Sequence, residues 1–81
     1  MTKQQLKDWI ETGRELEFEY QGNKYSITYY NDNRKDYTSF CQYYQETLDV
    51  SDVDTLWNST YREIVLSKMF SSIPKDEIDV A

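Results

Sequence analysis

The feature that most constrains the fold is a pair of alternating segments joined by a two-residue link that contains glycine. Residues 15–21 alternate acidic or polar with apolar side chains, residues 24–30 largely continue this alternation, and Gly22-Asn23 lies between them. A period of two is typical of β-strands, and such a link is typical of a tight turn. The sequence therefore predicts an antiparallel β-hairpin over residues 15–30.

With Gly22-Asn23 as the turn, the apolar side chains of this hairpin share one face. The expected pairs on that face are Tyr20 with Tyr25, Phe18 with Ile27 and Leu16 with Tyr29. The opposite face would hold Glu17, Glu19, Ser26 and Thr28. A slip of one residue would turn the apolar set toward solvent, so the faces are strongly specified.

Two short helices are expected on either side of the sheet. Thr2 and Gln5 form a capping-box pattern that predicts a helix over residues 3–12, with Leu6, Trp9 and Ile10 facing the sheet. Ser51 and Asp54 form a second such pattern, which predicts a helix over about residues 52–59.

A third strand is expected over residues 37–44, after a polar segment (residues 31–36) that ends the second strand. Its facing stays open, because both alternating sets contain large side chains. These sets are Tyr37, Ser39, Cys41 and Tyr43 against Thr38, Phe40, Gln42 and Tyr44.

The expected fold is α+β, in a single domain of residues 1–81. An N-terminal helix precedes an antiparallel hairpin extended to a three-stranded sheet, and one or two short C-terminal helices follow. Residues 64–66 could be an edge strand or a linker, and residues 75–81 are expected to be a flexible acidic tail.

The composition argues against catalysis and against a bound metal or cofactor. The 81 residues include no histidine and one cysteine, so the usual zinc sites and a Cys-His pair cannot be assembled within the chain. Asp49, Asp52 and Asp54 lack the spacing of a calcium loop. We expect a protein that is not an enzyme.

The charge argues against direct binding to nucleic acid or to an anionic membrane. The chain has 15 acidic and 9 basic side chains, for a net charge of -6, and most of the excess falls in the second half. Phosphate groups would repel such a surface. The lone cysteine and the lack of a long apolar segment favour a reducing cytoplasm.

Two residue groups are candidates for an interaction surface. Aromatic residues are more numerous than a small core can enclose, and the proposed interface comprises Tyr30, Tyr43, Tyr44, Trp57 and Tyr61. The second group is an acidic patch of Glu46, Asp49, Asp52 and Asp54. A solvated surface that maintains solubility is the simpler interpretation of the acids.

The run Trp57-Asn58, Tyr61, Ile64–Ser67 and Ser72–Pro74, together with the hairpin, resembles small uncharacterised proteins of bacterial and phage genomes. The resemblance implies a bacterial cytoplasmic setting and carries no motif of known chemistry. In its size, acidity and α+β character, the chain is also similar to phage anti-CRISPR and DNA-mimic inhibitors.

Two functional hypotheses follow. The first is a non-catalytic module or adaptor that binds another protein through its aromatic residues. The alternative is an acidic inhibitor that mimics nucleic acid and blocks a basic nucleic-acid-binding enzyme. An acidic mimic should bind less tightly as salt increases, whereas an aromatic interface should be less sensitive to salt.

Overall fold

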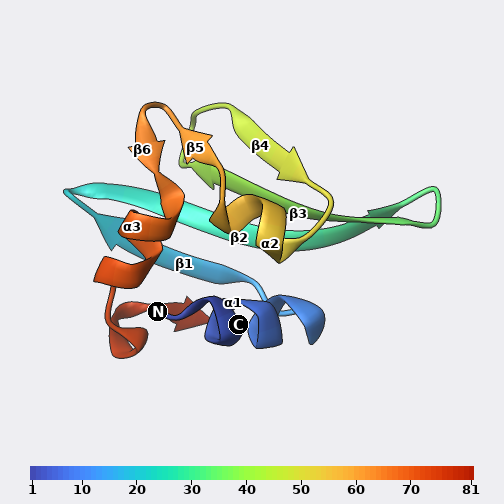
Figure 1. Ribbon diagram of the computed structural model, residues 1–81, viewed down its shortest axis with the longest axis horizontal. Helices are drawn as coiled ribbons and strands as arrows, with labels where there is room; N and C mark the ends of the chain where they lie inside the picture. Colours follow the sequence, from blue (N-terminus) through green and yellow to red (C-terminus); the bar gives the residue numbers. More distant parts are fainter.

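The computed structural model describes residues 1–81 as an α+β fold, which confirms the expected class (Figure 1). A five-stranded antiparallel sheet has the order β4-β3-β2-β1-β7, and β5 and β6 form a separate small hairpin. The expected sheet of three strands was therefore too small. In chain order the elements are α1 (Lys3–Glu11), β1 (Leu16–Tyr20), β2 (Asn23–Asp32), β3 (Lys35–Gln42), β4 (Thr47–Val50), α2 (Val53–Trp57), β5 (Thr60–Tyr61), β6 (Ile64–Val65), α3 (Leu66–Ser72), the 3-10 turn η1 (Lys75–Glu77) and β7 (Asp79–Val80).

The first hairpin is present, but its register differs from the expected one. Leu16 pairs with Ile27 and Phe18 with Tyr25, because the turn residues are Gln21-Gly22. Both turn residues have positive φ, 51° and 81°, and glycine occupies the second position as in Asn-Gly turns. The register is shifted by two residues, so every side chain keeps its expected face.

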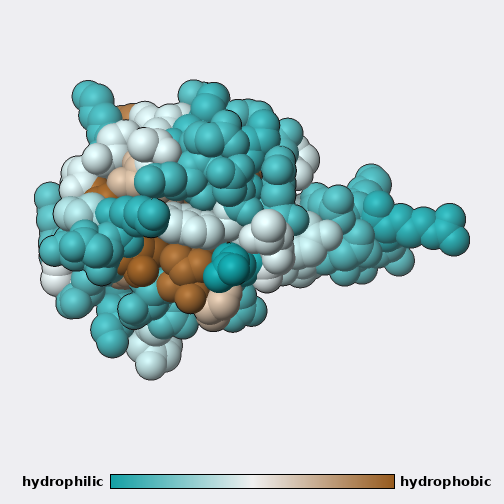
Figure 2. All heavy atoms as spheres, turned by 90° about the horizontal axis from the view of Figure 1, so that it is seen from below, coloured by the Kyte–Doolittle hydropathy of each residue, from teal (hydrophilic) through white to brown (hydrophobic).

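The second hairpin is longer than expected. Segment 31–36 does not form a loop, because β2 continues to Asp32 and β3 starts at Lys35. Only Asn33 and Arg34 form the turn, with φ of 51° and 67°. The β2–β3 ribbon therefore extends beyond the helices, and Figure 2 shows it as a hydrophilic projection.

The open question about the third strand is settled in favour of Thr38 and Phe40 as its buried side chains. Tyr37 and Cys41 lie on the opposite, half-buried face. The strand lies two residues earlier than expected, since it starts at Lys35 and ends at Gln42, and the next residues form a turn before β4.

Local capping explains the helix boundaries. The expected box at α1 is confirmed: the Gln5 amide donates to the Thr2 hydroxyl at 3.1 Å, and the Thr2 amide donates to the Gln5 side chain at 2.9 Å. The cap of α2 is Asp52 rather than Ser51, because the Asp52 carboxylate accepts the Thr55 amide at 2.7 Å. A carboxylate suits this position because it also complements the helix dipole.

The C-terminal residues form structure instead of the expected flexible tail. Strand β7 pairs with β1, and the Ala81 amide donates to the Glu15 carbonyl at 2.9 Å. Ile78 is 7% exposed and joins the core. Residues 64–65 form strand β6 of the small hairpin, and Leu66 begins α3.

One core lies between the sheet and the helices. Side chains from all three helices, from strands β1 to β3 and β5, and from Met1, Ile73 and Ile78 form a cluster of 16 buried residues. Phe40 lies in its middle, with ring centroids 5.6 Å from Tyr25, 5.7 Å from Phe70 and 5.0 Å from Tyr61. Leu6 and Ile10 join this core as expected, while Trp9 packs at its margin. No helix has the length and apolar character needed to cross a bilayer.

Candidate functional site

Of the five predicted interface aromatics, Tyr61 belongs to the core and Trp57 packs against it. Tyr61 is 4% exposed, and its hydroxyl accepts the Gln42 amide at 3.2 Å and donates to the Glu46 carbonyl at 2.6 Å. Trp57 is half-buried, with its ring centroid 5.6 Å from that of Phe70. The Tyr61 side chain is therefore structural, whereas Trp57 keeps part of its surface accessible.

Tyr30 lies on the face of the sheet that is away from the core. Its ring stacks on Tyr37 at a centroid distance of 5.1 Å, and 39% of Tyr30 stays exposed. Partial desolvation and the nearby Asp49 carboxylate raise the pKa of Tyr30. Tyr37 was absent from the predicted interface.

Tyr43 and Tyr44 lie together in the turn between β3 and β4, with ring centroids 6.2 Å apart. Hydrogen bonding to the Glu17 carboxylate raises the pKa of the Tyr43 hydroxyl. Tyr44 is 99% exposed and has a φ of 66°. A bulky residue in this left-handed conformation is uncommon, and here its side chain projects into solvent.

Together these residues border one uncovered surface, which we call the outer sheet face. All three helices pack against the opposite face of the sheet (Figure 1). Alternation along the paired strands defines the outer sheet face, which comprises Glu17, Glu19, Lys24, Ser26, Thr28, Tyr30, Asp32, Lys35, Tyr37, Ser39, Cys41, Thr47, Asp49 and Asp79. Near its centre the Ser26 hydroxyl lies 3.4 Å from the Cys41 sulfur.

The predicted acidic patch does not form one surface. Glu46 pairs with Arg62 at 3.0 Å, and Asp54 pairs with Lys3 at 3.3 Å and with Lys7 at 3.5 Å. Asp52 caps α2, whereas Asp49 belongs to the outer sheet face. Local pairing and capping therefore account for three of these four carboxylates.

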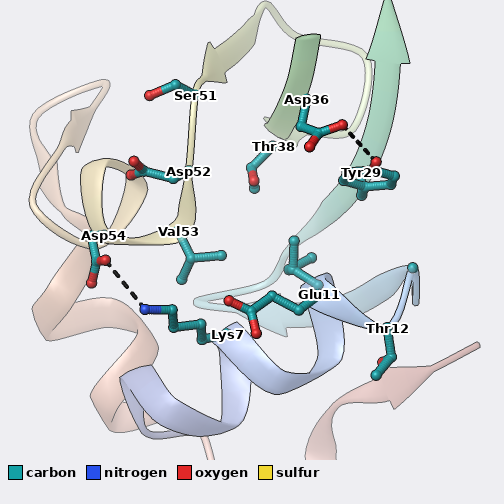
Figure 3. A pocket seen from close by; sticks show the side chains of 12 residues that line it. Lys7, Glu11, Thr12, Tyr29, Asp36, Thr38, Ser51, Asp52, Val53 and Asp54 are labelled. Carbon is teal, nitrogen blue, oxygen red and sulfur yellow. Dashed lines mark hydrogen bonds and ion pairs between the residues drawn. The ribbon is translucent and has the colours of Figure 1, made fainter. Parts of the chain in front are cut away.

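A second surface is a groove of about 690 Å³ between the end of α1, the start of α2 and the base of the β2–β3 ribbon (Figure 3). We call it the α1–α2 groove. The groove exists because the β2–β3 ribbon extends beyond the helices. The helix-facing side of the sheet is therefore uncovered at the base of the ribbon. Its lining comprises Lys7, Ile10, Glu11, Thr12, Gly13, Tyr29, Asp36, Thr38, Ser51, Asp52, Val53 and Asp54.

The wall formed by the ribbon contains a small hydrogen-bond network. The Tyr29 hydroxyl donates to Asp36 at 2.8 Å (Figure 3), and the Asn31 side-chain amide also donates to Asp36 at 2.8 Å. The bond from Asn31 and then that from Tyr29 lower the pKa of Asp36, which keeps this carboxyl ionised. A carboxyl with a lowered pKa is poorly matched to acid-base catalysis near neutral pH, but it binds cations well.

Sequence reasoning missed the groove. Alternation did place Tyr29 on the inner face, but that face was expected to be covered throughout. No family model, curated protein or solved structure matches this chain.

Proposed function

We propose that this chain is a non-catalytic module that binds another protein through its outer sheet face. The observation that carries the proposal is that helices cover one face of the five-stranded sheet and leave the other uncovered. Large surfaces without cover are typical of interaction sites when they contain exposed rings.

Aromatic side chains supply the anchors for such an interface. Tyr30 and Tyr37 stack on each other at 5.1 Å and are already ordered before any partner binds. Tyrosine is enriched at the energetic centres of interfaces, and ordered side chains lose less conformational entropy on association. The small side chains beside them, Ser26, Ser39 and Cys41, would let a partner approach the sheet closely.

A second candidate, the acidic inhibitor, is favoured by one feature of the same surface. Glu17 and Asp79 are directly opposite on neighbouring strands, and a shallow cleft beside them is also lined by Glu19 and Glu77. Like charges in this position are destabilising, so a cationic partner would relieve their repulsion. This interface would rest on charge instead of on the tyrosine pair.

Capture of partners from a bacterial lysate at ~50 mM and ~500 mM salt distinguishes the two candidates, because this change shortens the Debye length about threefold. An aromatic interface should retain the same partner at both salt concentrations. Replacement of both Glu17 and Asp79 by their amides should leave that capture unchanged.

The matched control replaces Glu63 and Asp8 by their amides, which removes the same charge away from the outer sheet face. A basic partner lost at high salt, and lost with Glu17→Gln and Asp79→Asn but not with the control, would favour the acidic inhibitor. Absence of any specific partner at both salt concentrations would contradict both candidates. A bacterial cytoplasmic setting remains part of the proposal.

A further inference from the structure

Thr38 is a buried polar side chain that lines the α1–α2 groove. It is 2% exposed, and its hydroxyl makes no hydrogen bond to another group of the protein. Every fully enclosed side-chain nitrogen or oxygen has a partner, so the Thr38 hydroxyl keeps its small exposed area in the groove. Water in the groove bonds to such an accessible hydroxyl, and a ligand bound there would take the place of that water.

The charges around this hydroxyl select a cation. Glu11, Asp36, Asp52 and Asp54 line the groove, and Lys7 is the single basic side chain among them, so the lining keeps an excess of negative charge although Asp54 pairs with Lys3 and Lys7 and Asp52 caps α2. Hydrogen bonds from the Thr55 side chain and backbone lower the pKa of Asp52, so this carboxyl is also ionised at neutral pH. The C-terminal end of α1 borders the same space, and the negative end of a helix dipole favours cations.

Apolar side chains in the groove suit a cation with an alkyl stem. Ile10 and Val53 are each 4% exposed and lie at its floor, and the ring of Tyr29 forms part of one wall (Figure 3). Lysine and arginine side chains combine an apolar stem with a head group that only donates hydrogen bonds. Such a head group matches a wall of carboxylates with a free hydroxyl.

The side chains of the groove do not form a simple metal site, and its size favours a peptide. No three acidic or other ligating side chains are placed to hold one metal ion. A volume of about 690 Å³ lies in the range of small-molecule sites and exceeds the needs of one alkylammonium group. An extended segment could fill the remaining space with its backbone.

We propose that the α1–α2 groove binds a lysine or arginine side chain from an extended basic segment of a partner protein. The groove is on the helix side of the sheet and the outer sheet face is on the other. This inference therefore goes beyond the proposed docking face, and either can fail without the other.

The test uses the full chain and short synthetic peptides, followed by amide chemical shifts at ~50 mM salt, where charge pairs are weakly screened. The probe is an acetylated and amidated Gly-Lys-Gly peptide, and its matched control has the same lysine acetylated on its side chain. The lysine peptide should shift the amides of Tyr29, Asp36 and Thr38 in a saturable manner. The acetylated peptide should leave them unchanged.

Two variants locate the binding site. Thr38→Val keeps the shape of the side chain and should weaken binding of the lysine peptide about fivefold, the effect of one lost hydrogen bond. Glu11→Gln changes an exposed helix residue, so the fold should tolerate it, and it should weaken binding about two- to fivefold. Glu63→Gln removes the same charge outside the groove and should have no effect.

Equal shifts with the lysine peptide and its acetylated form would overturn the proposal, as would no shift with either. Loss of affinity in Glu63→Gln equal to that in Glu11→Gln would also overturn it, because attraction would then come from net charge alone. Binding of n-butylammonium as tight as that of the peptide would contradict a peptide ligand and indicate a site for free amines.

Discussion

At the scale of single residues, Tyr61 shows how a side chain that resembles an interface residue in the sequence can be structural. Its hydroxyl bonds to the Gln42 amide and the Glu46 carbonyl, which are the two ends of the turn between β3 and β4. Arg62 adds contacts from the neighbouring small hairpin to Gln45 and Glu46. These bonds from Tyr61 and Arg62 therefore stabilise the turn that presents Tyr43 and Tyr44.

Tyr61→Phe should therefore lower the free energy of unfolding by about 0.5–1.5 kcal/mol, because two part-buried backbone groups lose a partner. Urea denaturation followed by circular dichroism measures the change. Tyr44→Phe is the matched control, since Tyr44 is 99% exposed and its hydroxyl makes no bond that stabilises the fold. A loss below about 0.5 kcal/mol in Tyr61→Phe would contradict this role.

The difference between the predicted and the observed interface also has its cause at this scale. Tyr30 and Tyr61 look alike in the sequence, because each is a tyrosine that a polar residue follows, Asn31 or Arg62. Their burial depends on which distant segment covers them: Tyr61 meets Phe40 from β3, whereas no helix covers Tyr30. The residues next to each tyrosine in the sequence do not predict such contacts with distant segments.

At the scale of elements, the two-residue turns determine the shape of the sheet. Three hairpins use consecutive residues with positive φ, at Gln21-Gly22, Asn33-Arg34 and Arg62-Glu63. Glycine takes this conformation without strain, whereas a residue with a Cβ atom is less stable there by about 1–2 kcal/mol. The tip of the β2–β3 ribbon therefore retains strain that its strands must offset.

Arg34→Gly should raise the free energy of unfolding by about 0.5–1 kcal/mol, because an Asn-Gly turn matches the twist of the strands and removes the strain at φ 67°. The urea midpoint reports the change. Lys35→Gly is the control, since Lys35 belongs to β3 and glycine should destabilise a strand there. Destabilisation by Arg34→Gly would show that this turn has another conformation.

Element prediction succeeded where alternation was long and failed where strands were short. The faces of β1 and β2 followed from alternation, but their register could not, since a shift of two residues leaves the pattern unchanged. Strand β4 has four residues and β7 has two, too few to show a period. Strand β7 is stabilised by its pairing with β1, a contact that links the two ends of the chain.

At the scale of the whole molecule, the fold has two different sides. One side is the outer sheet face, and the other contains the helices and the α1–α2 groove beside the ribbon (Figures 1 and 3). The ribbon contributes to the length of the molecule, which measures 35 × 24 × 21 Å along its principal axes. A net charge of -6 is divided between the two sides, so a basic partner would be attracted to either.

The central claim is that the tyrosine pair on the outer sheet face binds a partner protein, and capture by a double variant tests it most directly. Tyr30→Ser combined with Tyr37→Ser removes both rings, and Val65→Ser removes an exposed apolar side chain from the small hairpin as the control. Circular dichroism confirms that each variant is folded. We predict that the control retains the partner captured by the unmodified chain and that the double variant loses at least tenfold in affinity, about 1.4 kcal/mol. Equal capture by a folded double variant would contradict the claim.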